Sequence, residues 1–203
     1  MQETKTVNRY FIINKPPNMV SQFVSTHDVG LLGDLDFQFP EGIHAIGRLD
    51  SHSEGLLILT TNKKVTKLLF QGAVPHKRVY LVQVVNKVSE ATLTQLRTGV
   101  TIRIKGDVDY TTSPCDVEII EHPELITKQA YALPDYVSVT WLTITLTEGK
   151  FHQVRKMVKA VHHKCKRLIR ISIEDLLLGD LEPGAVKEIE EQTFFRLLKI
   201  DNW

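Results

Sequence analysis

Short hydrophobic runs separated by turn-forming residues mark the first third of the chain. An apolar run over 10–14 ends at a lysine and two prolines, which cannot continue a sheet ladder. The continuously apolar run over 56–61 is short enough for a strand buried on both faces. The pattern therefore predicts strands over 10–14, 43–46 and 56–61. Residues 21–42 mix polar and apolar positions and are expected to form a loop with one helical turn near 31–35.

The rest of the chain alternates helical and strand patterns. Asn62 and Ser89 stand where helix N-caps are expected, ahead of helices over 62–70 and 89–97. After Gly149, a helical stripe of Phe151, Val154, Val158 and Val161 predicts a helix with one apolar face. A last amphipathic helix is expected over 188–198, and a loop over 122–135. Runs rich in β-branched residues predict further strands over 78–86, 100–104, 115–120, 137–146 and 168–173.

This order of elements is not the regular strand–helix alternation of a doubly wound sheet. Several strands follow one another as hairpins, with only a few helices between them. We therefore expect an α+β fold with a mixed, mainly antiparallel central sheet, flanking helices and two subdomains around a cleft. The 203 residues are expected to form a single catalytic domain over 1–203.

Composition narrows the class of protein. With 42% hydrophobic and 24% charged residues, the chain is ordinary for a soluble globular protein, and no run of 18 apolar residues or signal peptide is evident. We expect a cytoplasmic protein. Cys115 and Cys165 lie 50 positions apart without metal-binding spacing, so both are expected to be reduced thiols. His162 and His163 near Cys165 do not complete a tetrahedral site, and no metal is expected.

The net charge of +1 conceals a strong segregation of charge. Residues 148–170 hold eight basic residues and three histidines against one acid, whereas residues 171–203 hold eight acids against three bases. A positive surface on a neutral protein suits a polyanionic partner. A charged, solvated helix explains the same pattern, and charge alone slightly favours it.

Asp50 is the first candidate for chemistry, because it lies in a glycine-bounded loop between two expected core strands. An Asx-turn is the ordinary alternative for an isolated aspartate. Glu54 lies four residues later and raises the possibility of a two-carboxylate glycosidase. Arg155 is a candidate partner that would hold Asp50 ionised. Tyr80 offers a stacking face for a nucleobase, or else is a strand tyrosine in the core.

Four segments together resemble the RNA pseudouridine synthases. Residues 47–62, GRLDSHSEGLLILTTN, are similar to the GRLDxx(T/S)EGLLLLTND signature of that family. Residues 148–157, EGKFHQVRKM, resemble its EG(R/K)xxQVR(R/K)M motif, and residues 166–170 resemble its RLIR element. Residues 10–21, YFIINKPPNMVS, are similar to its first motif. The resemblance covers nearly the whole chain and is greatest to the branch of ribosomal synthases that includes the large-subunit type E subgroup.

The resemblance implies a role for each matching residue. Asp50 corresponds to the essential aspartate, Arg155 to its basic partner and Tyr80 to the tyrosine that packs on the target base. Arg48 corresponds to the arginine near the extruded nucleotide, and Leu168 to the apolar residue of the uracil pocket. Asn18, His162 and Lys164 depart from the usual pattern, which affects loop geometry rather than chemistry. Further contacts with RNA are expected from Lys15, Lys156, Lys159, Arg167 and Arg170.

The resemblance also implies a substrate and a reaction. We expect a uridine of ribosomal RNA, specifically 23S rRNA, to be isomerised to pseudouridine by a monomer that needs no cofactor and lacks the N-terminal S4 domain of most relatives. Asp50 would attack C1′ or remove the C2′ proton, and the sequence does not choose between them. Two alternative functions remain: a non-catalytic rRNA-binding assembly factor, and a glycoside hydrolase that uses Asp50 and Glu54.

Overall fold

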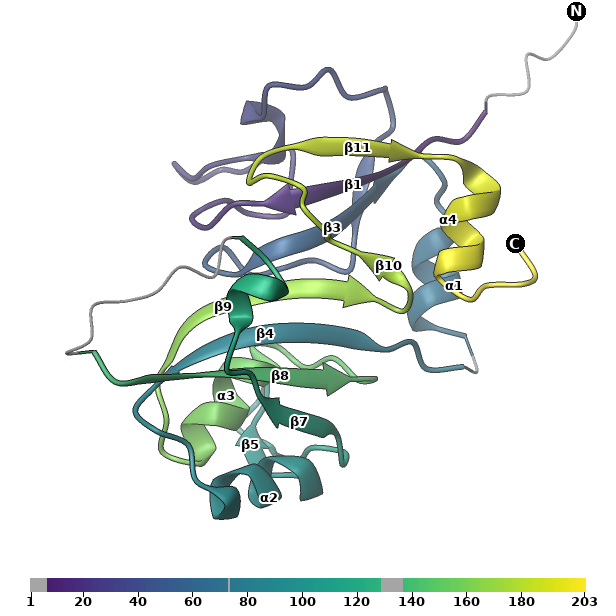
Figure 1. Ribbon diagram of the computed structural model, residues 1–203. Coiled ribbons are helices and arrows are strands. Elements are labelled where there is room, and N and C mark those ends of the chain that lie inside the picture. Colours follow the sequence, from purple (N-terminus) through teal and green to yellow (C-terminus); the bar gives the residue numbers. More distant parts are fainter. Residues whose placement is uncertain (1–6, 73, 129–136) are drawn as a thin grey trace, which may run out of the picture.

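A nine-stranded mixed sheet runs through the described part of the computed structural model, which comprises residues 7–72, 74–128 and 137–203. The main path is β11-β1-β3-β9-β4-β8-β7, with β2 added beside β3 and β10 beside β9 (Figure 1). These strands are β1 (Tyr10–Lys15), β2 (His44–Ile46), β3 (Glu54–Thr60), β4 (Arg78–Val85), β7 (Asp116–Ile119), β8 (Val139–Leu146), β9 (Cys165–Ile173), β10 (Leu176–Leu177) and β11 (Val186–Ile189). A separate hairpin joins β5 (Thr101–Arg103) to β6 (Asp109–Thr111).

The two halves of the sheet meet at one short parallel contact. Glu54 and Gly55 of β3 pair with Ile169 and Arg170 of β9, whereas the other strand pairs are antiparallel. Gly55 has φ +97°, and a Cβ there would lie 2.4 Å from the carbonyl oxygen of Arg170. Only glycine permits this close approach without displacing the backbone. The expected α+β fold with a mainly antiparallel sheet is confirmed.

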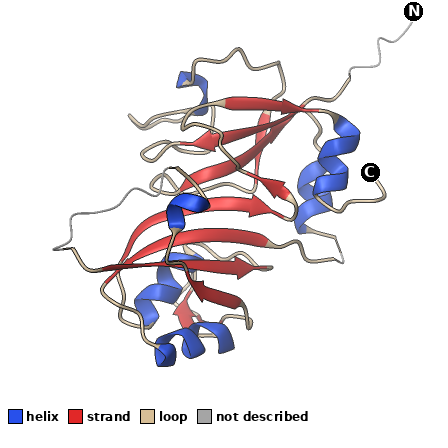
Figure 2. Cartoon of the chain, in the orientation of Figure 1, coloured by secondary structure: helices blue, strands red, loops and turns tan. Residues whose placement is uncertain are grey.

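Helices cover the two halves separately. On the first half, α1 and α4 lie side by side against one face (Figure 2), where the apolar residues of β1 and β3 pack on Val65, Leu69, Phe194 and Phe195. On the second half, α2 and α3 pack on Val82, Val84, Leu142 and Ile144. The helices are α1 (Val65–Phe70), α2 (Glu90–Thr98), α3 (Gln153–Ala160) and α4 (Glu191–Leu197), with 3-10 turns η1 (Leu32–Asp34) and η2 (Pro123–Leu125).

The loop that follows β1 covers the opposite face of the first half. Met19, Leu32 and Leu49 pack there against Phe11, Ile13, Leu57 and Leu59, and they form a third hydrophobic cluster. The helical turn expected near 31–35 is η1. This packing matters for function because the same loop reaches the segment between β2 and β3, which contains Asp50.

Several predicted boundaries are wrong for local reasons. Asn62 does not cap α1; its Oδ1 accepts from the backbone N–H of Lys64, and the helix begins only at Val65. The last helix begins at Glu191 rather than at 188, because Glu188 and Ile189 belong to β11. Ser89, in contrast, caps α2 as predicted by accepting from Thr92 N–H. The hairpin strand β6 was not predicted, and much of the 122–135 loop lies outside the described residues.

The apolar face predicted for α3 is wrong at its first residue, Phe151. The helix begins at Gln153, one residue after His152, whose φ of +55° lies in the left-handed region. Val154 and Val158 are buried as expected, but the side chain of Phe151 falls outside the helix and is 66% exposed. Phe151 therefore lies on the surface beside the helix rather than in the core.

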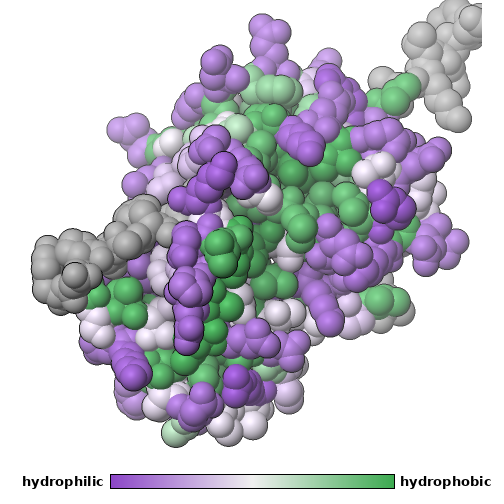
Figure 3. All heavy atoms as spheres, in the orientation of Figure 1, coloured by the Kyte–Doolittle hydropathy of each residue, from purple (hydrophilic) through white to green (hydrophobic). Residues whose placement is uncertain are grey.

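Polar residues cover the margins of the face shown in Figure 3, and hydrophobic residues show along its middle. Cys115 and Cys165 are both free thiols. Within the described residues, no helix has the length and apolar composition that a membrane span requires.

Candidate active site

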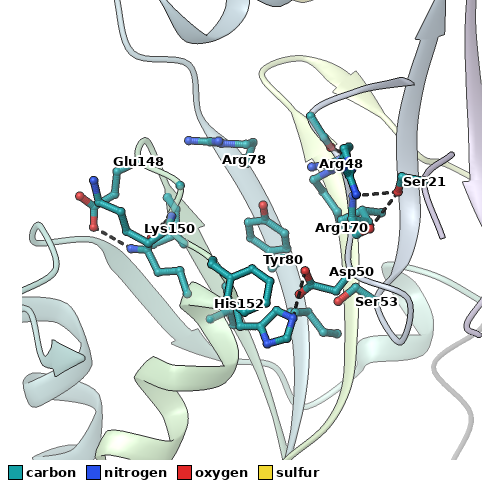
Figure 4. Close-up of a pocket in the computed structure, with 18 of the residues that line it drawn as sticks. Ser21, Arg48, Asp50, Ser53, Arg78, Tyr80, Glu148, Lys150, His152 and Arg170 are labelled. Atoms are coloured by element: carbon teal, nitrogen blue, oxygen red, sulfur yellow. Dashed lines mark hydrogen bonds and ion pairs between the residues drawn. The ribbon is translucent and has the colours of Figure 1, made fainter. Parts of the chain in front are cut away.

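A cleft of about 610 Å³ opens where the two halves of the sheet meet. The segment between β2 and β3 contributes Gly47, Arg48, Leu49, Asp50, Ser51 and Ser53 to its walls. Most of the other lining residues come from β4, β9 and the stretch from Glu148 to the start of α3. Such a volume lies in the range of small-molecule and nucleotide sites. Figure 4 shows Asp50 and His152 directed toward each other in this cleft, with the ring of Tyr80 beside them.

The segment that presents Asp50, residues 47–53, is fixed by side chains from distant parts of the chain. The hydroxyl of Ser21 accepts from Leu49 N–H at 3.0 Å and donates to the Leu49 carbonyl at 2.8 Å. Lys15 Nζ donates to the carbonyl of Ser51 at 3.2 Å. These bonds satisfy backbone groups that a loop would otherwise leave to water, and they hold the carboxylate in place.

Asp50 lies beside a histidine rather than the expected arginine. Nε2 of His152 is 3.3 Å from Oδ1 of Asp50, and the two side chains are 40% and 30% exposed. Across the described residues, Asp50 and Arg155 form no direct ion pair. Nη2 of Arg155 instead donates to the carbonyl of His52 at 3.0 Å and lies 3.4 Å from Ser53 Oγ. The prediction of a direct Asp50–Arg155 contact is therefore wrong, although Arg155 does bind the same loop.

Tyr80 and Leu168 both line the cleft, on the adjacent strands β4 and β9. Behind Tyr80 lies the fully buried Arg170, whose Nε donates to the Leu56 carbonyl and whose Nη2 donates to the Gly47 carbonyl. Burial lowers the pKa of Arg170, and interaction with Tyr80 opposes this change. Arg170 thus connects β9 to Gly47, at the start of the Asp50 segment, and to Leu56 of β3 just after it, and its guanidinium is directed into the protein rather than to open solvent.

Glu54 is not available as a second catalytic carboxylate. Its side chain is mostly buried, and both oxygens accept from Arg167, at 3.0 Å from Nε and 2.7 Å from Nη2. The structure therefore removes the basis for a two-carboxylate glycosidase. It also gives Arg167, which was expected to contact RNA, an acidic partner within the protein.

Lys15 is also buried rather than directed at a ligand. Its Nζ donates to the carbonyls of Pro16, Met19 and Ser51. Burial lowers the pKa of Lys15 to about 8, while the charges of Glu54 and Asp50 act in the opposite direction. The position under the Asp50 segment indicates support of the loop.

The exposed cations lie on and beside α3. Lys159 lines a second cavity of about 520 Å³ together with Arg155, His162, His163, Lys164 and Cys165. Lys156 Nζ lies 5.3 Å from the centroid of the Phe151 ring. Arg48 is exposed on the opposite wall of the main cleft. Arg48 therefore gives one wall of the main cleft a positive charge, and Lys156 and Lys159 make the surface of α3 positive.

A comparison with known protein families matches the part of the chain that contains most of these site residues. The family model described as RNA pseudouridylate synthase matches residues 9–160, which include β1, the Asp50 segment, Tyr80 and Arg155. The chain belongs to the RNA pseudouridine synthase family.

Relatives within this family resemble the chain over most of its length. A protein of Vibrio parahaemolyticus named ribosomal large subunit pseudouridine synthase E is 36% identical over 90% of this chain and 74% of its own. Its namesake from Xanthomonas axonopodis pv. citri is 33% identical over 85% of this chain and 89% of its own. A crystal structure titled pseudouridylate synthase superposes with a TM-score of 0.74 at 25% identity, over 94% of this chain and 74% of that one.

Three residues of this pseudouridine synthase site were not singled out from the sequence. Ser21 holds the Asp50 segment, His152 contacts Asp50, and Glu148 joins the β5–β6 hairpin to the start of α3. Glu148 accepts from Tyr110, Ser113 and Gln153. Burial acts to raise the pKa of Glu148, but these hydrogen bonds outweigh it and hold the pKa below its ordinary value. All three stand inside the quoted motifs, but nothing in the sequence marks the contacts that they make.

No cluster of three or more histidine, cysteine, aspartate or glutamate side chains suited to a metal ion occurs in the part of the chain that the structure describes.

Proposed function

We propose that this protein isomerises a specific uridine of ribosomal RNA to pseudouridine, with Asp50 as the catalytic group. The observation that carries the proposal is the position of Asp50: a partly exposed carboxylate, held on an anchored loop, that faces Tyr80 across a cleft of nucleotide size. Large-subunit rRNA is the proposed substrate because several relatives are named for it. The proposal includes action as a cytoplasmic monomer, since one chain forms the whole cleft.

The reaction breaks the N1–C1′ bond, turns the uracil and joins C5 to C1′, with loss of the C5 proton and gain of a proton at N1. It needs no change of oxidation state. The Asp50 carboxylate would either attack C1′ to form a covalent intermediate or remove the C2′ proton to form a glycal. Both routes require the uridine to leave the RNA stack and enter the cleft.

The surrounding residues have supporting roles in this proposal. The ring of Tyr80 would pack on the extruded uracil, with Leu168 on the apolar side of the pocket. Arg48, Lys156 and Lys159 would contact phosphates on the two sides of the cleft. Arg155 would act as a positioning residue, because its guanidinium binds the loop rather than the carboxylate.

The test is product formation by matched variants. Wild-type protein, Asp50→Asn and Asp201→Asn would be incubated with rRNA labelled with tritium at uridine C5, with tritium release and the map of pseudouridines as readouts. Asp50→Asn should abolish release and leave RNA binding nearly intact, whereas the same change at the exposed Asp201 should have no effect. Turnover by Asp50→Asn would overturn the assignment. RNA binding by the wild-type protein without any product would favour a non-catalytic assembly factor.

A further inference from the structure

Arg78 is a buried cation in the cleft that lacks a partner. Its residue is 9% exposed, it lines the cleft, and its Nε has no hydrogen-bond partner. Among the described residues it forms no ion pair, and its guanidinium carbon lies 5.5 Å from the centroid of the Phe70 ring. Burying a charge without a partner is costly, so such a group usually has a ligand that compensates it.

The space around Arg78 is kept open by a glycine. A Cβ on Gly149 would lie 3.2 Å from Nη1 of Arg78, which is tighter than ordinary contact. The segment before α3 therefore leaves room for the guanidinium at the wall of the cleft. Arg78 also lies close enough to Arg170 for its positive charge to add to the lowering of the Arg170 pKa, which is mainly due to burial. This part of the cleft is thus positively charged and suits an anion.

The strand geometry places Arg78 at a defined distance from the proposed base site. Arg78 and Tyr80 line the cleft and the intervening Val79 does not, as expected when alternate residues of β4 share a face. Residues two apart on a strand are separated by about 6.6 Å. A nucleotide whose base lies on Tyr80 therefore brings one of its own phosphates toward Arg78.

We propose that Arg78 binds a backbone phosphate directly attached to the target uridine. This inference rests on the proposed function for the identity of the nucleotide. The planar guanidinium presents several N–H donors that match phosphate oxygens. The contact would exist only when the nucleotide is inside the cleft, so it would help to offset the cost of extruding the base. It differs in this respect from a contact made by Lys159 of α3, which is exposed and accessible to RNA outside the cleft.

The test is a binding cycle between protein and RNA that does not depend on turnover. The probes are nine-nucleotide oligouridylates, unmodified or with one neutral methylphosphonate linkage at each position in turn. Affinity would be measured by fluorescence anisotropy at several salt concentrations for wild-type protein, Arg78→Gln, Arg78→Lys and Gly149→Ala. Arg196→Gln is the matched control, because Arg196 is an exposed arginine of α4 outside the cleft.

Arg78→Gln should weaken binding about 10-fold or more, the size expected for a charge-assisted hydrogen bond. The slope of log affinity against log salt should become shallower by about 0.7, which corresponds to one phosphate of a single strand. One methylphosphonate position should weaken binding to wild-type protein but not weaken it further for Arg78→Gln. Arg78→Lys should keep the salt slope with reduced affinity, Gly149→Ala should lose part of the affinity, and Arg196→Gln should match the wild type.

If Arg78→Gln binds RNA with the same affinity and the same salt slope as the wild-type protein, the proposal is wrong. The proposal is also wrong if Arg78→Gln loses affinity but each methylphosphonate position weakens binding to the variant and to the wild-type protein equally. If Arg78→Gln does not fold, Gly149→Ala provides the test, because it keeps Arg78 and shifts only its guanidinium. If Gly149→Ala then responds to the methylphosphonate linkages as the wild-type protein does, the contact is absent. Failure of the proposed function would instead show as absence of pseudouridine with wild-type protein, whatever the binding cycle gives.

Discussion

Arg155 and His52 are joined across 103 positions of sequence by a hydrogen bond of 3.0 Å from the guanidinium Nη2 to the backbone carbonyl. His52 lies two residues after Asp50, so this bond connects α3 in the second half of the sheet to the Asp50 segment in the first. The arginine expected to hold the carboxylate by charge therefore holds the backbone that carries it. Its effect on catalysis should be one of position.

Replacement of Arg155 tests this role. Arg155→Ala should lower kcat by about 100-fold, because a catalytic group displaced by about 1 Å loses activity of that order. KM should change less, and Arg155→Lys should recover part of the activity by donating one bond to the His52 carbonyl. The measurement is steady-state tritium release from rRNA. A loss confined to KM, or equal losses for Ala and Lys, would contradict a positioning role.

Replacing Tyr80 tests whether its aromatic ring or its hydroxyl group matters for activity. Tyr80→Phe keeps the face that would stack on uracil and removes only the interaction with Arg170, so it should retain activity within about 10-fold of wild type. Tyr80→Leu keeps an apolar side chain but no aromatic face, and should lose about 1–3 kcal/mol of base stacking. Turnover of both variants would be compared at saturating and limiting RNA. Loss in Tyr80→Phe as complete as in Asp50→Asn would mean that the hydroxyl takes part in the chemistry.

The positive surface of α3 predicts a salt effect. Lys156 and Lys159 would each neutralise one phosphate, so replacing both with alanine should weaken RNA binding and reduce the log–log salt slope by about 1.4 for a single-stranded contact. The matched control is Lys63→Ala with Lys187→Ala, which removes the same charge from exposed sites on the segment before α1 and on β11. An unchanged slope for the α3 variant, or an equal change for the control, would place the RNA surface elsewhere.

Much of the fold was predictable because hydrophobic periodicity and capping are local properties. The buried run of β3 and the Ser89 cap of α2 are examples. β11 escaped prediction because it is an edge strand whose Lys187 and Glu188 are exposed, so it lacks an apolar alternation. The helix after it is capped by Glu190, whose carboxylate accepts from the N–H groups of Gln192 and Thr193, and a glutamate is not a usual capping signal.

The site was predictable as a set of residues but not as a set of contacts. The motifs marked Asp50, Tyr80 and Arg155, and the structure brings all three to one region of the fold. The contact of Asp50 with His152 depends on the left-handed conformation of His152, which turns its ring toward the loop and leaves Phe151 exposed. A single positive φ angle at a non-glycine residue has no reliable signature in sequence, although such angles are frequent at functional sites.

Lys15 provides a test of how the loop is supported, through the dependence of stability on pH. Burial lowers its pKa in the folded protein to about 8, against 10.5 for an ordinary lysine. Between these values the unfolded chain binds more protons, so this group makes the free energy of unfolding rise as the pH increases. From pH 8 to 9 the wild-type protein should gain roughly 1 kcal/mol relative to Lys15→Met, in which the titrating group is absent.

Urea denaturation of the two proteins at each pH gives this difference directly, and contributions from other groups, such as the half-buried thiols of Cys115 and Cys165, cancel in the comparison. Lys63→Met, at an exposed lysine, should track the wild type at both pH values. Lys15→Met should also be less stable throughout, because the carbonyls of Pro16, Met19 and Ser51 lose their donor. A stability difference that stays constant from pH 8 to 9 would show that Lys15 keeps an ordinary pKa, and that the loop beneath Asp50 is open to water.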